Sequence, residues 1–235
     1  MNRPSHFYDS PWFKGIGAVV AVLVGVVALV GPLRGLIGDI FAGSGLPGVE
    51  YEIVFDHGSG MNTEVNAQGE TKLTQAKREV TRVVSPITSD GLALRTFGGD
   101  CNETSSVPPR VPFGANHNDD VINEIKQLPP GNGKSNLYGA VSAAVQDFND
   151  LPPDTVKNVF VYVGAIDSCG ASASSTATDI KNFLAQRDIN AAFKFFTFDL
   201  SQQDQSELQS FRRILPKVEV VPTGPSGAEG PASAP

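Results

Sequence analysis

Between residues 49 and 221, short apolar segments typical of strands alternate with segments of helical periodicity. The run 158–163 is almost continuously apolar, as expected of a strand that is buried on both faces. Strands that alternate with helices predict an α/β fold, here a Rossmann-like, doubly wound and mostly parallel sheet flanked by helices. The expected strands are 49–55, 91–97, 158–163, 191–200 and 217–221, and the expected helices are 71–84, 119–128, 137–148, 176–187 and 201–215.

The predicted sheet also indicates where a ligand would bind. In open α/β sheets, ligands occupy the crevice beyond the carboxyl ends of the strands. The loops after Phe55, Phe97 and Val163, together with the loop before Leu137, should therefore gather at one edge. This edge is the first place to look for functional side chains.

A second pattern precedes the predicted domain, because residues 15–33 contain no charged side chain. Such a run is about long enough to cross a bilayer as a helix. Trp12 and Phe13 stand where interfacial aromatics are expected, and Lys14 and Arg34 bracket the run. A cleaved signal peptide is the main alternative, but its apolar region is usually shorter and ends in a small-residue cleavage site. A buried helix of a soluble domain is the third possibility, and we expect a retained transmembrane helix.

The flanking charges suggest an orientation for this anchor. Arg3 and Lys14 favour a cytoplasmic N-terminus, so a single-pass protein of the plasma membrane would place its folded domain outside the cytoplasm. The expected organisation is a short N-terminal tail (1–14), a transmembrane helix (15–33), a linker (34–48), the α/β domain (49–223) and a disordered Gly/Pro/Ala/Ser-rich tail (224–235).

The overall charge and the cysteine content exclude several classes of function. The formal net charge is −7, which makes nucleic acid an unfavourable partner. The two cysteines, Cys101 and Cys169, have no cluster of histidines nearby and cannot build a zinc site, which needs about four ligands. They could form one disulfide in an oxidising compartment.

Three segments together resemble the von Willebrand factor type A family. The loop Asp56–Asn62 (DHGSGMN) is similar to the family's D-x-S-x-S loop, and Gly133–Tyr138 (GKSNLY) is similar to its G-G-T-N-L-Y segment. Val161–Ala165 (VYVGA) stands where the family has an apolar strand that ends in T-D-G or S-D-G. The sequences around Cys101 and Cys169 resemble a cysteine-containing, membrane-anchored extracytoplasmic branch. The resemblance implies the A-domain fold over about residues 49–221 and a disulfide between these two cysteines.

The resemblance also implies a metal-ion-dependent adhesion site, and this sequence departs from it. Asp56 matches the first aspartate of the family's site and Ser135 matches its threonine, whereas Gly58, Gly60 and Gly164 stand where two serines and an aspartate are expected. Magnesium prefers six oxygen ligands in near-octahedral geometry, and glycine offers no side-chain oxygen. We therefore expect a degenerate site and no metal cofactor.

Weak alternatives for a ligand at this edge remain. Asp56, Ser135 and Asp167 are the candidate ligands if Mg²⁺ or another divalent cation binds, and Ser59 lies between the degenerate positions. A glycine-rich loop could instead present free N–H groups to a partner's carboxylate. Gly133-Lys134-Ser135 fails as a phosphate-binding loop because the first glycine of that pattern would fall at Leu128, so no nucleotide is expected.

These observations favour a membrane-anchored, non-enzymatic module that binds a protein or another envelope component without a metal. One alternative is an adhesion domain that depends on Mg²⁺ or Mn²⁺, and another is a structural subunit of a membrane complex. No paired carboxylates and no nucleophile–base pair are found at the expected edge, so no enzymatic activity is predicted. Replacing Asp56 by alanine should matter for the metal-dependent alternative and little otherwise.

Overall fold

The computed structural model describes residues 48–101, 109–152, 154–167 and 169–224 of the 235-residue chain. The expected N-terminal tail, transmembrane helix and most of the linker, as well as the C-terminal tail from residue 225, lie outside the described residues. Among the residues that are described, no helix combines the length and apolar character needed to cross a bilayer.

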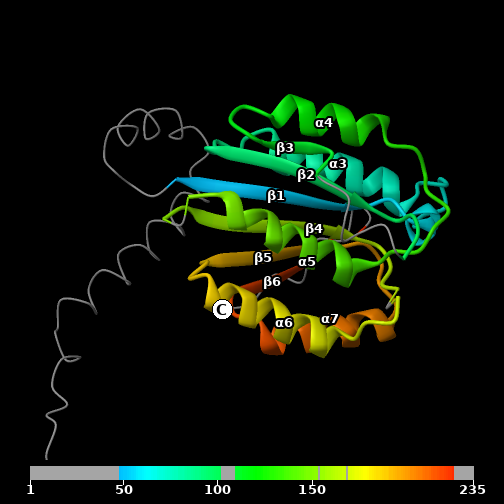
Figure 1. Cartoon of the computed structure of the whole chain (residues 1–235). Helices are drawn as coiled ribbons and strands as arrows, with labels where there is room; N and C mark the ends of the chain where they lie inside the picture. Colours follow the sequence, from blue (N-terminus) through cyan, green and yellow to red (C-terminus); the bar gives the residue numbers. More distant parts are fainter. Residues whose placement is uncertain (1–47, 102–108, 153, 168, 225–235) are drawn as a thin grey trace, which may run out of the picture. The chain divides into compact units, whose positions relative to one another are not determined.

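Six strands form one sheet in the order β3-β2-β1-β4-β5-β6 (Figure 1). All neighbouring pairs are parallel except β2 and β3, which are antiparallel. The α/β, mostly parallel sheet expected from the sequence is therefore confirmed. The strands are β1 (Val49–Asp56), β2 (Gly91–Phe97), β3 (Val111–Gly114), β4 (Val156–Val163), β5 (Ala191–Thr197) and β6 (Val218–Pro222).

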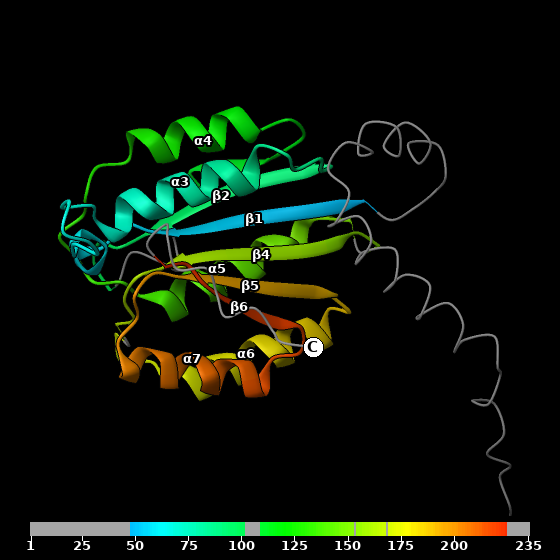
Figure 2. The same cartoon turned by 180° about the vertical axis from the view of Figure 1, so that it is seen from behind.

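Five helices cover the two faces of the sheet (Figures 1 and 2). The helices are α3 (Lys72–Val84), α4 (Asn118–Gln127), α5 (Leu137–Asp147), α6 (Ala173–Gln186) and α7 (Gln202–Ile214). Apolar side chains of α3 and α4 form one core cluster with the sheet, and those of α5, α6 and α7 form the other. Each of the ten expected elements is present, although several begin or end a few residues from the expected position.

The strand β3 was not expected from the sequence. It has four residues, includes Pro112, and pairs with β2 through an irregular register. Proline cannot donate a ladder hydrogen bond and is confined to strand edges and bulges. Because the segment lies at the edge of the sheet and is so short, it leaves no periodic pattern in the sequence.

The central strand β1 is buried on both faces, which explains its composition. Ile53 and Phe55 pack in the cluster under α3 and α4, while Val54 packs in the cluster under α5. β1 lies between β2 and β4, and the sheet continues to β3 on the β2 side and to β5 and β6 on the β4 side. The carboxyl ends of β1 and β4 therefore form the switch point of the sheet, where this kind of fold binds its ligands.

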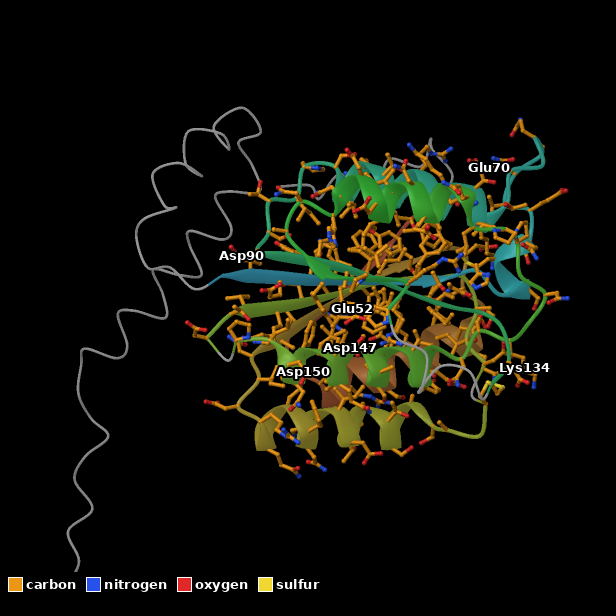
Figure 3. All side chains as sticks on the ribbon, turned by 45° about the horizontal axis from the view of Figure 1, so that its top comes forward. Glu52, Glu70, Asp90, Lys134, Asp147 and Asp150 are labelled. Carbon is orange, nitrogen blue, oxygen red and sulfur yellow. A yellow bond between two sulfur atoms is a disulfide. The ribbon has the colours of Figure 1, made fainter. Side chains whose placement is uncertain are left out.

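A buried ionic network links β1, β2 and α5. Glu52 on β1 has no exposed surface, and it accepts a hydrogen bond of 3.2 Å from the guanidinium of Arg95 on β2. Arg95 also pairs with Asp147 at the end of α5. Figure 3 shows Glu52 and Asp147 between the sheet and this helix. Burial and the nearby Asp147 raise the pKa of Glu52 well above its ordinary value, although Arg95 opposes the shift.

Candidate functional site

The carboxylate of Asp56 is the centre of the site at the switch point. Asp56 is the last residue of β1, and its side chain has no exposed surface. One carboxylate oxygen accepts hydrogen bonds from the Gly58 N–H and from the Ser135 hydroxyl, both at 2.8 Å. The other accepts from the Gly164 N–H at 3.3 Å, and the Ala165 N–H also donates to the carboxylate. Three segments that are far apart in the sequence thus converge on one side chain.

The burial of Asp56 changes its acidity. Burial raises its pKa to about 6, and the hydrogen bonds from Gly58, Ser135, Gly164 and Ala165 oppose the shift. The loss of hydration therefore outweighs four favourable contacts. Removing the side chain would leave several buried donors without an acceptor, and each such donor costs about 1–3 kcal/mol. Asp56→Ala is therefore expected to destabilise these loops even without a metal, because Asp56 holds them together.

The three glycines at the degenerate positions are closely packed and leave no open ligand positions. A Cβ atom on Gly58 would come within 2.5 Å of the Ser135 Oγ, and one on Gly60 would overlap the Cβ of Ala165. A Cβ on Gly164 would overlap the Sδ of Met61, which is fully buried. Neighbouring atoms therefore occupy the space that oxygen-bearing side chains would need.

The remaining hydroxyl and carboxylate groups also have structural partners. The Asp167 carboxylate accepts a hydrogen bond of 2.8 Å from the Ser135 N–H, and the Asp167 N–H donates to the Ser135 carbonyl at 2.9 Å. Asp167 therefore holds the segment before α5 in place through two hydrogen bonds to Ser135. This role was not predicted from the sequence, in which Asp167 is only a possible cation ligand or a solvated loop carboxylate.

A divalent cation does not fit this arrangement. Asp56 and Ser135 are both fully buried and hydrogen-bonded to each other, whereas Mg²⁺ needs open oxygen lone pairs and water. Within the described ranges, no group of three or more His, Cys, Asp or Glu side chains is placed to hold a metal ion. The described residues therefore do not offer the ligand set that the resemblance implies.

Loops from different parts of the chain pack backbone against backbone around the buried carboxylate. The Ser59 N–H donates to the Gly133 carbonyl at 2.8 Å, and the Lys134 N–H donates to the Gly99 carbonyl at 2.9 Å. A Cβ atom on Gly133 would overlap the backbone of Gly99, so this approach requires glycine. With the N–H groups of Gly58 and Ser59 engaged inside the protein, these two groups cannot serve in a nest for an anionic partner.

The disulfide and two polar side chains fix this edge further. Cys101 and Cys169 are bonded, as the resemblance implied, with their Cα atoms 5.4 Å apart. Asn136, which caps α5, donates from its amide to the Cys101 carbonyl at 2.9 Å. Lys72 on α3 is buried, and its ammonium donates to the carbonyls of Gly164 and Asp199 at 3.0 and 2.8 Å. Sequence patterns did not reveal Asn136 or Lys72, because both act through backbone carbonyls of distant loops.

The outer surface of this edge is polar and open to solvent, and we call it the rim. It comprises the exposed residues Ser59, Asn62, Asp100, Asn132 and Lys134. A shallow cavity of about 520 Å³ lies in it between the Asp100–Cys101 and Asn132–Lys134 segments. Figure 3 shows Lys134 beside the disulfide at this end of the sheet. The rim is thus a polar surface above a buried carboxylate.

Comparisons with known proteins place the fold. No protein-family model and no curated protein matches the chain. An aerotolerance-related membrane protein from Bacteroides fragilis matches with a TM-score of 0.53 at 13% identity, over 74% of this chain and 90% of that one. The pilus adhesin SpaC from Lactobacillus rhamnosus GG matches with a TM-score of 0.56 at 11% identity, over 75% of this chain and 29% of that one. At these identities the two likenesses show a shared fold.

A third solved structure is a von Willebrand factor type A protein from Catenulispora acidiphila. Its TM-score is 0.48 at 15% identity, over 74% of this chain and 39% of that one.

The packing of Gly164 leads to a first prediction. Gly164→Ala should lower the free energy of unfolding by about 1–3 kcal/mol, because the new Cβ overlaps the Met61 Sδ. In a Met61→Ala background the same substitution should cost much less, so a double-mutant cycle measured by urea unfolding should show strong coupling. Equal costs in both backgrounds would show that the two positions are not in contact.

The raised pKa of Asp56 predicts a pH dependence. Its pKa is about 6 in the folded state and near 3.8 when unfolded, so the native protein binds more protons between these values. The contribution of Asp56 to stability is therefore fully present below about pH 4 and is lost as the pH rises through 6, by up to about 3 kcal/mol.

The measurement compares Asp56→Asn with the unmodified chain by urea unfolding from pH 4 to 7. The variant lacks the titrating group and should show the smaller decline. Glu50 and Glu52 also have raised pKa values, but they titrate in both proteins and cancel in the comparison. Parallel curves for the two proteins would contradict the assignment.

Proposed function

We propose that this chain is a membrane-tethered A-type domain of the von Willebrand factor family, which binds a protein or another envelope component through its rim without a divalent cation. The observation that carries the proposal is the sealed Asp56, whose oxygens are occupied by internal donors while Met61 and Ala165 fill the space beside Gly164 and Gly60. The switch point is where a sheet of this kind binds ligands, but its side chains here offer no open oxygen ligands to a metal ion.

Several features support the rest of the proposal. The uncharged run at residues 15–33 is suited to a membrane anchor with the domain on the extracytoplasmic side. A bond between Cys101 and Cys169 persists in an oxidising compartment, which agrees with that side. The fold is shared with an aerotolerance-related membrane protein and with a pilus adhesin. No catalytic role is proposed, because the buried carboxylate and hydroxyl serve the packing of the loops.

The rim can be tested directly by photo-crosslinking in intact membranes. A photoreactive amino acid at Ser59 or Lys134, both exposed, should yield defined crosslinked products. The matched control is the same amino acid at Asp150, which is exposed at the other end of the sheet (Figure 3). The products should persist in EDTA, since no cation mediates the contact. Products at Asp150 alone would locate binding elsewhere, and loss of the rim products in EDTA would favour the metal-dependent adhesion domain.

A cation titration tests the metal-independent part separately. Ligand binding to the native state raises stability by RT ln(1 + [L]/Kd), so a functional site should raise the melting temperature as Mg²⁺ or Mn²⁺ is added. We expect no such rise for the full-length chain in detergent over the millimolar range. The control is Ca²⁺ at equal ionic strength, which separates specific binding from screening. A saturable increase with Mg²⁺ or Mn²⁺ that disappears in Asp56→Asn would refute the proposal.

A further inference from the structure

The outer edge of β6 is a free strand edge. β6 is the last strand of the sheet and pairs with β5 on one side only. The Phe193 N–H donates to the Lys217 carbonyl at 2.9 Å, and the Thr223 N–H donates to the Thr197 carbonyl at 2.8 Å. Alternate residues of a strand direct their backbone groups to the same side. Glu219 therefore faces β5, whereas the N–H and C=O groups of Val218 and Val220 face outward.

These outward groups are available and rigidly held. Across the described ranges, no other backbone or side-chain group hydrogen-bonds to the outward N–H groups of Val218 and Val220. Both side chains pack against the core cluster of α5, α6 and α7, which fixes the strand. A strand edge of this kind is a template for pairing with another chain. Both edge strands contain a proline, Pro112 in β3 and Pro222 in β6, but β3 is the shorter strand and pairs irregularly with β2.

A cavity of about 530 Å³ lies at the carboxyl end of β5 and β6. Its walls combine the apolar side chains of Leu200 and Leu208 with the amides of Gln75 and Gln209. Gln75 is buried, and its side chain interacts with the carboxylate of Glu70. The cavity therefore combines apolar walls with polar ones.

The charge of the cavity selects a basic ligand. Asp199 is the one charged residue in the lining, and it is exposed. Its carbonyl accepts a hydrogen bond from Lys72, which fixes the backbone, while its carboxylate forms no ion pair with the described residues. The end of the free edge thus presents an acidic group with no neighbouring base in the lining.

We propose that the free edge of β6 and the adjoining cavity bind an extended, basic segment of a partner protein. The segment adds as a further strand through the outward groups of Val218 and Val220, and a lysine or arginine side chain enters the cavity to meet Asp199. This site is separate from the rim, which lies around the ends of β1, β2 and β4.

A second copy of the chain fits this edge less well. Antiparallel pairing of two β6 strands about Glu219 would set the two Glu219 side chains opposite each other, and like charges at that spacing are destabilising. Glu219 is largely exposed and has Lys194 as its partner within the same chain. Such a dimer would also bring no basic group to the cavity that holds Asp199.

The test uses two synthetic peptides, Thr-Val-Thr-Val-Lys and Thr-Val-Thr-Val-Glu, with the full-length chain in detergent. Hydrogen exchange with residue-level readout should show fast exchange at Val218 and Val220 in the free protein, and protection of both in the presence of the lysine peptide. The glutamate peptide should bind about two- to fivefold more weakly, as expected for the loss of one exposed charge pair. Asp199→Asn should reduce this preference, and the distant Asp150→Asn should not.

A second variant tests the strand pairing separately from the charge preference. Val220→Pro removes one outward N–H but leaves the ladder to β5 intact, so it should weaken peptide binding while Glu219 and Val221 remain protected from exchange. If that variant fails to fold, a peptide N-methylated at its central threonine removes the same kind of bond from the ligand side. The proposal is overturned if the lysine peptide protects neither amide or if both peptides bind equally. It is likewise overturned if protection without peptide grows with protein concentration, which would assign the edge to a second copy.

Discussion

The burial of one ionised side chain, Asp56, constrains the whole carboxyl edge of the sheet. A buried carboxylate is unfavourable by several kcal/mol unless donors replace the lost water. The donors come from the loop after β1, from the start of α5 and from the loop after β4, which are separated by about a hundred residues of sequence. Each loop must therefore take one position, and the remaining contacts of this edge are compatible with that position.

Two features of this edge belong to one arrangement: the glycines at positions where the resemblance implies metal ligands, and the close packing of the loops. Where the resemblance would place oxygen donors, Gly58, Gly60 and Gly164 allow neighbouring atoms to approach within the volume of a side chain. The backbone of Gly133 lies against that of Gly99, and the disulfide ties the same edge. The surface that faces solvent is polar, and loops tied together by such contacts lose little conformational entropy when they bind a partner.

Polar residues of β1 also determine how α5 lies on the sheet. Asp56 holds the segment before the helix through Ser135, and Glu52 reaches Asp147 at the other end of the helix through Arg95. Directional contacts at the two ends of the helix favour one register over a shift by a turn. Buried acids in a central strand thus contribute specificity, and their raised pKa values reflect the desolvation that this requires.

Local pattern determined much of this protein. Alternation of strand-like and helical segments was enough to predict the parallel sheet and its helices, because periodicity and burial are properties of short segments. The order of the segments around Asp56 and Ser135 was enough to predict which loops meet at the candidate site. Only the tertiary structure decided what surrounds Gly58, Gly60 and Gly164. That Met61 fills the space beside Gly164, that Asp167 clamps Ser135, and that β6 leaves one edge unpaired are contacts between distant segments, or the lack of them. Such contacts depend on three-dimensional packing, which the spacing of residues along the chain does not record.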